Sequence, residues 1–488
     1  MEEAIKPVKE KSIKKNYIYN LIYKLFAVLV PILITPYLSR VLDADGNGVI
    51  SFVSSIVSYF ILASNVGIET YGQRMISIHR NDKAYLKKFM FEVTLMRTIL
   101  TLVCLGIYYA VFVGGNAEDR MLYAIYGISL FAVTFDFTWF FQGVEDFKIL
   151  ALTGIISKII YIILLFQLVT GRDDIHIAAG LAIMSTALPH LMCVPFAKKY
   201  IGGKIEGKIN PFRHFKECMV YFIPTIAVQI YTVVDRTMIG LITNSDFENG
   251  YYEQAEKLIK MPLAIITSLN IIVRARISYL YSIGEENKIK KLIDNSANFA
   301  FMLAIPMMFG MLAVAKTLVP VYLGYGYDKC ITLIYVFAPI ILAISVSNLL
   351  GTHYYTPFGM QKKSNIFLIT GAIINVILNS FLIYYLKSIG AAIASVTAET
   401  IIAILYVYNA RKFVPILHLL KISVKYLIAG IVMFIAVYLL DQRLSGGFVN
   451  LVIEMLFGVV LYFVVLLLLR TRYLIDFIKS IFAKIRRR

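Results

Sequence analysis

Cationic side chains inside an apolar segment of membrane-spanning length are the first feature of this sequence that could do chemistry. Residues 270–280 read NIIVRARISYL, which places Arg274 and Arg276 at the end of a long apolar segment. An uncompensated charge at the centre of a bilayer costs roughly 3 kcal/mol even on the lenient insertion scale. Such residues therefore pair with other charges or mark a substrate path. Arginine suits phosphate because its planar guanidinium donates two charge-assisted hydrogen bonds.

The polar residues of segment 250–282 share one face of the helix that the sequence predicts. At about 100° per residue, they lie within about 40° of Glu256, and the stripe is ~33 Å long, which matches a bilayer core. A stripe of that length lines water or packs on another polar stripe. Arg276 points roughly the other way, and snorkelling to the headgroups explains it as well as a binding role does. The other residues of the stripe are Lys260, Thr267, Asn270, Arg274 and Ser278, and Glu253 lies at its edge, about 60° away.

Further ionisable and amide side chains lie in other apolar segments, and intramembrane charges usually face a bundle interior or a wet cavity. Acids and bases are nearly balanced, so some of them pair with each other. We expect Lys24, Lys260 and Arg274 to be available to an anionic ligand, although a helix–helix salt bridge is the alternative for Arg274. The candidate substrate-binding cations are Lys24, Lys260, Arg274, Arg276 and Arg236. The candidate cavity acids or ion-coupling groups are Asp136, Asp235, Glu256 and Glu399, and the polar cavity residues are Asn20, Thr267, Asn270, Asn375 and Asn379.

The elements that must position these residues are membrane-spanning helices. The chain of 488 residues is 59% hydrophobic and only 16% charged, whereas a soluble protein of this length needs far more charge. A span needs about 20 apolar residues. The sequence predicts an all-α polytopic membrane protein with about fourteen spans, centred on residues 17–38, 48–70, 89–113, 120–141, 148–170, 175–197, 217–243, 250–282, 293–322, 331–356, 366–386, 390–410, 422–440 and 448–469.

The distribution of lysine and arginine predicts the orientation of these spans. With the N-terminus in the cytoplasm, the tails and inner loops carry 32 Lys and Arg residues and the outer loops carry six. The formal net charge of +18 is therefore explained mostly by cytoplasmic loops, without nucleic acid. We expect a multi-pass protein of the bacterial cytoplasmic membrane with both termini in the cytoplasm.

A faint internal repeat predicts two lobes. An acidic turn followed by Asn-Gly and a new helix occurs at Asn47-Gly48 and again at Asn249-Gly250. The first and seventh spans run in the same direction, so the halves would be parallel repeats. We expect a tail (1–16), an N-lobe (17–197), a basic cytoplasmic linker (198–216), a C-lobe (217–413), two extra spans (421–470) and a basic tail (471–488).

Motifs of enzymes and metal sites are absent from the sequence. It contains no Walker loop, HExxH, GxSxG or CxxC, and its four cysteines are far apart. We therefore expect no catalytic residues, metal or cofactor, apart from a coupling ion, H⁺ or Na⁺, carried by Asp136, Asp235 or Glu399. The pattern is typical of a transporter.

Several segments resemble one family, the Wzx-type polysaccharide-repeat-unit flippases of the multidrug/oligosaccharidyl-lipid/polysaccharide (MOP) superfamily, which also holds MATE transporters and lipid II flippases. The resemblance covers nearly the whole chain, and one departure is Ala275-Arg276, where the family usually has Pro-Arg. Its most specific parts are Trp139-Phe-Phe-Gln-Gly143 and the run that begins Gly390-Ala-Ala. The other segments are LITPYLSRVLDADGNGVISF, YFIPTIAVQIYTVVDRTMIG, LNIIVRARISYL and GAIINVILNSFLIYYLKSIG.

The resemblance implies two six-helix lobes around a central cavity and two extra C-terminal helices. It implies that an undecaprenyl-pyrophosphate-linked oligosaccharide, a precursor of capsule, O-antigen or teichoic acid, moves from the inner to the outer leaflet by alternating access. Expected partners are this lipid-linked oligosaccharide, membrane lipids, the polysaccharide polymerase and other assembly proteins. One alternative is a MATE-like drug/cation antiporter, whose cavity should be net acidic. Another is a membrane polysaccharide polymerase or ligase, which would need a larger outer loop than any predicted here.

Overall fold

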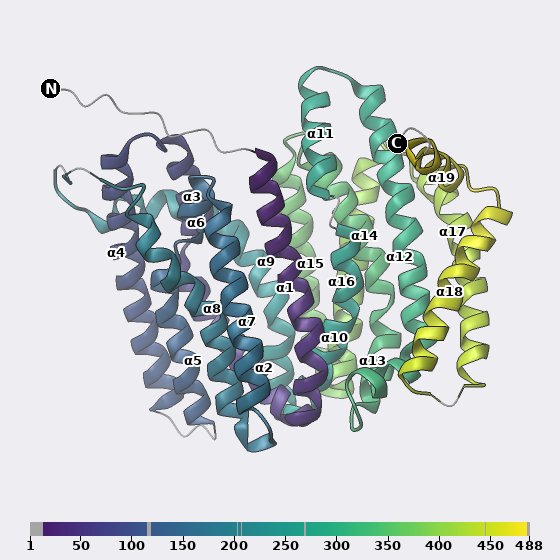
Figure 1. The fold of residues 1–488 in the computed structure, drawn as a ribbon, viewed down its shortest axis with the longest axis horizontal. Coiled ribbons are helices and arrows are strands. Elements are labelled where there is room, and N and C mark those ends of the chain that lie inside the picture. The colour runs from purple at the N-terminus through teal and green to yellow at the C-terminus, as the bar shows by residue number, and fades with distance from the viewer. Residues whose placement is uncertain are drawn as a thin grey trace. The chain divides into compact units, whose positions relative to one another are not determined.

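A computed structural model describes residues 13–114, 119–202, 204–205, 207–267, 270–444 and 446–485, and these form helices and no strand. The all-α fold class predicted from the sequence is confirmed. The chain divides into two compact units, Met1–Thr237 and Met238–Arg488, coloured purple to teal and green to yellow in Figure 1. The division falls inside one helix, α9, whereas the lobe boundary at 216/217 and the other predicted domain limits stay predictions.

The first unit consists of long helices joined by short turns. Within it, α7 and α8 pack closely, and α1 packs along α7. Its helices are α1 (Ile13–Val41), α2 (Asp43–Asn65), α3 (Ile68–Ile78), α4 (Lys83–Tyr108), η1 (Tyr109–Val113), α5 (Arg120–Ala132), η2 (Val133–Phe135), α6 (Thr138–Gly143), α7 (Phe147–Leu168), η3 (Arg172–Asp174), α8 (Ile175–Ala197), η4 (Pro211–His214) and the first part of α9 (Phe215–Thr243).

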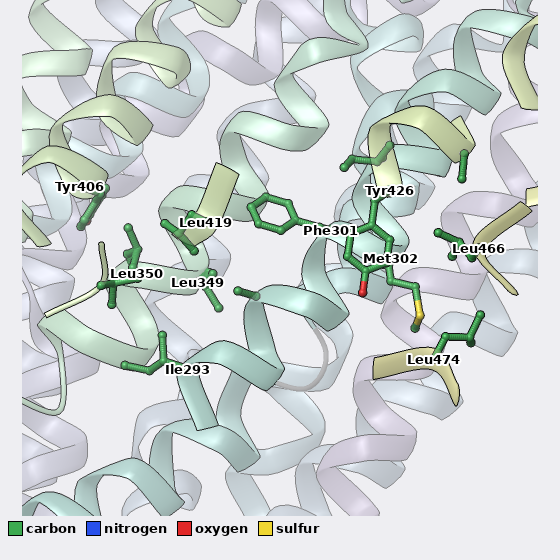
Figure 2. Packing of buried hydrophobic residues seen from close by; sticks show 14 of the residues in the cluster. Ile293, Phe301, Met302, Leu349, Leu350, Tyr406, Leu419, Tyr426, Leu466 and Leu474 are labelled. Carbon is green, nitrogen blue, oxygen red and sulfur yellow. The ribbon is translucent and has the colours of Figure 1, made fainter. Parts of the chain in front are cut away.

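The second unit contains two closely packed helix pairs, α15 with α16 and α12 with α17, and α18 packs on α17. Its core includes Phe301 and Met302 of α12 with Leu349 of α14, and Figure 2 shows this packing. The helices are α10 (Asp246–Thr267), α11 (Asn270–Ser282), α12 (Glu286–Tyr322), α13 (Asp328–Phe337), α14 (Pro339–Leu350), η5 (Gly351–Tyr355), α15 (Gln361–Leu386), α16 (Ser388–Ala410), α17 (Ile416–Asp441), α18 (Phe448–Leu468) and α19 (Arg472–Ile485).

Ten helices or joined helices in the described residues are long and apolar enough to cross a membrane, and the pair Asp328–Phe337 and Pro339–Tyr355, bent by 40°, would be an eleventh. These eleven coincide with eleven of the fourteen predicted spans. The other three predicted spans coincide with α1, α9 and the α10–α11 segment. Charged side chains interrupt α10, so its apolar character is weaker than that of its neighbours.

The motif Trp139-Phe-Phe-Gln-Gly143 forms the short helix α6 in the interior of the first unit. Trp139, Phe140 and Phe141 are almost fully buried. A Cβ on Gly143 would lie 2.6 Å from Cβ of Ile76 in α3, so only glycine allows α3 and α6 to approach this closely. The family motif therefore serves packing.

The run that begins at Gly390 also permits close packing of two helices, here in the second unit. Lys387 adopts a left-handed φ of 53° between α15 and α16, which reverses the chain in one residue. A Cβ on Gly390 would lie 2.1 Å from the Leu382 carbonyl oxygen. Small residues at such a crossing let two membrane helices pack backbone to backbone.

Both Asn-Gly pairs lie inside first helical turns, where the sequence analysis expected turns before the helices. The helix α2 begins at Asp43 and α10 begins at Asp246. Asn47 is buried and its amide donates to the carbonyl oxygens of Leu38 and Asp43 at 3.1 and 2.8 Å. The side chain therefore satisfies backbone acceptors at a helix junction, and a turn is not required.

Candidate functional site

A polar cavity of about 190 Å³ lies inside the first unit, between helices that span the membrane. Its wall combines a cation, an imidazole, hydroxyls, an amide and an aromatic ring. The helices α1, α6, α7 and α8 contribute these groups. They include Tyr23, Thr138, Gln142, Lys158, Ser185 and His190.

An ion pair at one wall of this cavity joins a break in the fifth helix to α8. Asp136 follows η2 with an extended backbone (ψ 101°), so its side chain caps α6 and accepts from the Thr138 amide at 2.9 Å. The same carboxylate oxygen lies 2.9 Å from Nδ1 of His190. Asp136 is buried, so its charge requires these donors.

The fully buried guanidinium of Arg97 lies on the other side of this break. Its Nη1 donates to the carbonyl oxygens of Asp136 and Val133 at 2.6 and 3.0 Å. The Asp136 carbonyl also accepts from the Trp139 indole at 2.9 Å. Nε and Nη2 of Arg97 have no hydrogen-bond partner among the described residues. Arg97 thus supplies a positive field behind Asp136.

Lys158 is the cavity cation that the sequence analysis did not single out. Its Nζ lies 3.2 Å from Oγ of Ser185 on α8, and its side chain is partly buried. It sits in the middle of the most apolar part of α7. A lone lysine in the middle of an apolar span was therefore enough to identify Lys158 as a candidate functional residue from the sequence. His190 carried no such signal, because a single histidine after a proline is common in helix cores.

The second unit contains a separate cavity of about 210 Å³ whose wall includes Thr267. The hydroxyl of Thr267 donates to the Leu263 carbonyl at 2.9 Å, so the side chain is satisfied within its own helix. Other polar groups on this wall come from α12, α14, η5 and α19. They are Asn295, Ser296, Ser345, Asn348, His353 and Tyr473.

Lys260 forms an ion pair with Glu256, although we expected it to be available to an anion. Nζ of Lys260 lies 2.6 Å from Oε1 of Glu256, one turn earlier, and the lysine side chain is about half exposed. Glu253 pairs with Lys257 in the same way at 2.9 Å. The i,i+4 spacing brings these charges together on the helix surface. Such exposed pairs are weak, so an incoming anion can compete for the lysine.

The described residues of the predicted polar stripe fall on α10 and α11. α10 ends at Thr267, α11 begins at Asn270, and residues 268–269 lie outside the described residues. Arg274 and Arg276 are both exposed on α11. The guanidinium carbon of Arg276 lies 5.4 Å from the ring centroid of Tyr279. An unbroken helical wheel from Glu256 to Arg274 therefore stays a prediction.

Two predicted cavity residues take part in helix packing. Asn375 and Asn379 on α15 are fully buried, and the amide of Asn379 donates to Oδ1 of Asn375 at 3.1 Å. Asn375 in turn donates to Oγ of Ser395 on α16 at 3.2 Å, and Tyr252 of α10 lies 3.2 Å from the same oxygen. Small residues on α16 bring the helices close enough for these amides to bond to them, and a role of Asn375 and Asn379 in a cavity stays a prediction.

The remaining candidates stay predictions. Asp235 is buried and Arg236 is partly buried on α9, and Glu399 is buried on α16. The side chains of Asn20, Lys24 and Asn270 lie outside those that the structure describes.

A charged cluster that the sequence analysis missed joins three helix ends of the second unit. Nζ of Lys329 lies 2.6 Å from both carboxylate oxygens of Glu248. The hydroxyl of Ser388 donates to Oε2 of Glu248 at 2.6 Å. These residues are far apart in the sequence and no local pattern links them. Burial opposes the charge on Glu248, but the lysine and serine bonds outweigh it and lower the pKa of this carboxyl.

The family of polysaccharide biosynthesis proteins matches residues 13–277. A protein of Escherichia coli strain K12 described as "Putative O-antigen transporter" is 23% identical over 411 residues, which cover 82% of this chain and 97% of that protein. Among solved structures, a lipid II flippase MurJ in an inward closed conformation has a TM-score of 0.73 at 17% identity, covering 92% of this chain and 97% of that one. An inward-facing MATE family transporter has a TM-score of 0.58 at 14% identity, covering 83% and 99%.

Proposed function

The chain belongs to the polysaccharide biosynthesis protein family, and on this premise we propose that it is a flippase for an undecaprenyl-pyrophosphate-linked oligosaccharide. It moves this lipid from the inner to the outer leaflet of the bacterial cytoplasmic membrane by alternating access. The cargo is a precursor of capsule, O-antigen or teichoic acid. The relative described as an O-antigen transporter supports this substrate class.

The observation that carries the proposal is a cation on the wall of a polar cavity inside a membrane-spanning unit. Lys158 lies in the cavity of the first unit with the hydroxyl of Ser185 beside it. A charge at this position is unfavourable for the empty bundle and becomes favourable when an anion enters. The pyrophosphate of the cargo is such an anion, and the hydroxyl and amide groups of the wall suit a sugar.

Arg274, Lys260 and Lys24 are proposed as further headgroup ligands. Arg274 is exposed on α11, and Lys260 is held only by a half-exposed ion pair. The cationic character of this set favours an anionic cargo over the cationic drugs of an antiporter. Asp136, whose carboxylate contacts His190, is proposed as the place where a coupling ion would bind.

The first prediction concerns transport by the purified protein in liposomes that contain a fluorescent lipid-linked sugar. We expect Lys158→Gln to slow the initial rate of flipping on the order of tenfold, the loss of one charge-assisted contact. Lys158→Arg should retain most of the rate, and Arg274→Ala should lose more than Arg274→Lys. The readout is quenching of the label by a reagent confined to one side of the bilayer.

Lys148→Gln is the matched control, because Lys148 is exposed on the same helix and does not line the cavity. A parent protein that leaves the lipid-linked sugar in place but exchanges a cationic drug for protons would contradict the flippase and favour the antiporter. Equal loss of rate in the two glutamine variants would remove Lys158 from the binding site.

A further inference from the structure

A basic pocket of about 540 Å³ lies in the second unit, at the end where α12 and α17 begin and α18 ends. α19 starts at the same end (Figure 1), and residues of its first turns line the pocket. Four cationic and two acidic side chains line the pocket, which leaves an excess of two positive charges. The cations are Lys291, Lys421, Lys425 and Arg472, and the acids are Asp294 and Asp476.

The walls of the pocket are held in place by contacts between these helices. Nζ of Lys425 donates to the carbonyl oxygens of Leu469 and Arg470 at 2.8 and 3.3 Å, which caps the end of α18. The hydroxyl of Tyr426 donates to Oδ1 of Asn298 on α12 at 3.0 Å. Beneath them, Tyr426, Leu466 and Leu474 belong to the apolar core of the unit (Figure 2). The cavity is therefore built into the packing of four helices.

None of the four cations has an acidic partner among the described residues, and three of them are also without a carbonyl partner. Lys425 is occupied by the carbonyl oxygens, and Asp294 is engaged by His418, whose Nε2 lies 2.5 Å away. Lys291, Lys421 and Arg472 form no ion pair within the part of the chain that the structure describes. The first turn of α19, with Arg472 in it, also presents the positive end of a helix dipole. Together these groups favour a bound anion.

The pocket lies at the level of the lipid headgroups. α12 has 37 residues and is about 55 Å long, whereas the hydrocarbon core is about 30 Å thick, so it must project from the core at one end or both, and α17 begins and α18 ends beside its first turns. Lys291 is in the second turn of this helix. The lysine and arginine count assigns this end to the cytoplasm, the side on which anionic lipids attract basic residues.

An apolar surface for acyl chains continues from the pocket along α17. Leu417 is 64% exposed, Leu420 56% and Val424 49%, and they form a stripe that continues through Ile428 and Ile435. At about 100° per residue, Lys421 and Lys425 lie about 40° and 80° from Leu417, beside this stripe. A molecule with an anionic head and apolar tails matches both surfaces, whereas a free phosphate matches only the first.

We propose that this pocket is a binding site for the phosphodiester headgroup of an anionic glycerophospholipid, with the acyl chains along the exposed face of α17. The site is formed by the second unit alone and does not depend on the flippase proposal. Binding at the α17–α19 segment would then depend on the anionic lipid content of the surrounding membrane.

The test measures lipid binding, not transport. The full-length protein in a neutral detergent is titrated with phosphatidylglycerol or phosphatidylcholine of identical acyl chains, and bound lipid is counted by native mass spectrometry. The parent should bind phosphatidylglycerol at least tenfold more tightly. The double variant Lys291→Gln/Lys421→Gln should lose roughly 30-fold in affinity, at the usual contribution of a lysine near an anionic lipid.

Two variants and one competitor separate the alternatives. Lys362→Gln/Lys363→Gln, at exposed positions at the start of α15 outside the pocket, should bind like the parent, and so should Lys291→Arg/Lys421→Arg. Equal affinity for the two lipids, or an equal loss in the Lys362/Lys363 variant, would overturn the proposal. Complete displacement of phosphatidylglycerol by millimolar inorganic phosphate would show a small-anion site instead, and would overturn the lipid assignment.

Discussion

Some buried carboxylates in this protein have hydrogen-bond donors and others do not. Asp136, Glu92 and Glu248 each have donors from other elements. Glu454 of α18 is fully buried, and neither of its carboxylate oxygens has a hydrogen-bond partner among the described residues. A buried polar group without a partner loses its hydration and gains nothing in return.

The second prediction follows at the residue scale. Glu454→Leu should raise the thermal unfolding midpoint or leave it unchanged, because it replaces an unsatisfied carboxyl with an apolar side chain of similar size. Asp441→Leu is the comparison. Asp441 is also buried, but the hydroxyl of Thr317 donates to it, so its loss should lower the free energy of unfolding by about 1–3 kcal/mol.

The measurement is the unfolding midpoint of the detergent-purified variants, followed by size-exclusion chromatography after heating. If Glu454→Leu destabilises the protein as much as Asp441→Leu does, Glu454 has a functional or structural partner. Coupling of transport to an ion would then be a candidate role for the α17–α18 pair.

At the scale of elements, the linker that ends in η4 is held on the first unit by buried polar contacts. The Asn210 amide donates to Oε1 of Glu92 on α4 at 3.1 Å, and Nε2 of His214 lies 3.2 Å from Oε2 of the same residue. The other ring nitrogen of His214 lies 3.1 Å from the Tyr71 hydroxyl. Burial lowers the pKa of His214 below its usual 6.5, and the nearby Glu92 only partly opposes this effect.

The third prediction is a loss of stability in acid that depends on this linker. Because the pKa of His214 is lower in the folded protein, the unfolded chain takes up a proton more readily. The stability contributed by neutral His214 is therefore present above about pH 6.5 and is lost as the pH falls below it. The unfolding midpoint should drop more between pH 7.5 and 5.5 in the parent than in His214→Gln.

The two proteins are compared in the same detergent at constant ionic strength, since other groups titrate in both and only the difference reports on His214. An identical drop in the parent and in His214→Gln would mean that folding leaves the pKa of His214 unchanged, with the pairing to Glu92 cancelling the effect of burial. A smaller drop in the parent would mean that the pairing with Glu92 outweighs burial.

At the scale of the whole molecule, directional transport needs a source of free energy. The sequence contains no Walker loop, so the chain itself has no recognisable site for ATP hydrolysis. A lipid pyrophosphate carries about two negative charges, and moving them outward across a potential that is negative inside gains roughly 4–5 kcal/mol per 100 mV. The gain requires that the protein's cations move less than the substrate does, as expected when helices rock about a nearly fixed site.

The fourth prediction is that an imposed potassium-diffusion potential accelerates flipping of the lipid-linked sugar toward the positive side of the liposome. Reversing the sign of the potential should slow the same movement. A coupled proton or sodium ion, carried by Asp136, Asp235 or Glu399, is the rival account. It predicts a response to pH or sodium gradients instead.

Asp136→Asn, Asp235→Asn and Glu399→Gln distinguish these accounts, because removing the carrier of a coupled ion should abolish the response to its gradient and leave a response to the potential in place. A rate that is indifferent to the potential and to both gradients would contradict both accounts. Passive equilibration, driven by consumption of the lipid on the outside, would then explain transport.

Much of the fold was predictable from the sequence. Apolar segments of about 20 residues placed the helices, since hydrophobic length is a local property. The family motifs were also visible, although their physical role in packing α3 on α6 and α15 on α16 needed coordinates. The break at Asp136 was not predicted, because tertiary contacts decide where a helix is interrupted.

The candidate site was only partly predictable. Charged residues inside spans could be recognised singly, and Lys260 and Arg274 were found in this way. The sequence could not assign the partners of such polar residues. Lys260 pairs with Glu256, Asn375 donates to Ser395 on α16, and Lys158 lines one cavity together with Ser185 and His190. The sequence determined which helices exist and which residues are costly to bury. Only the tertiary structure decided which charges meet, because that depends on how each helix is rotated against neighbours that are distant in the chain.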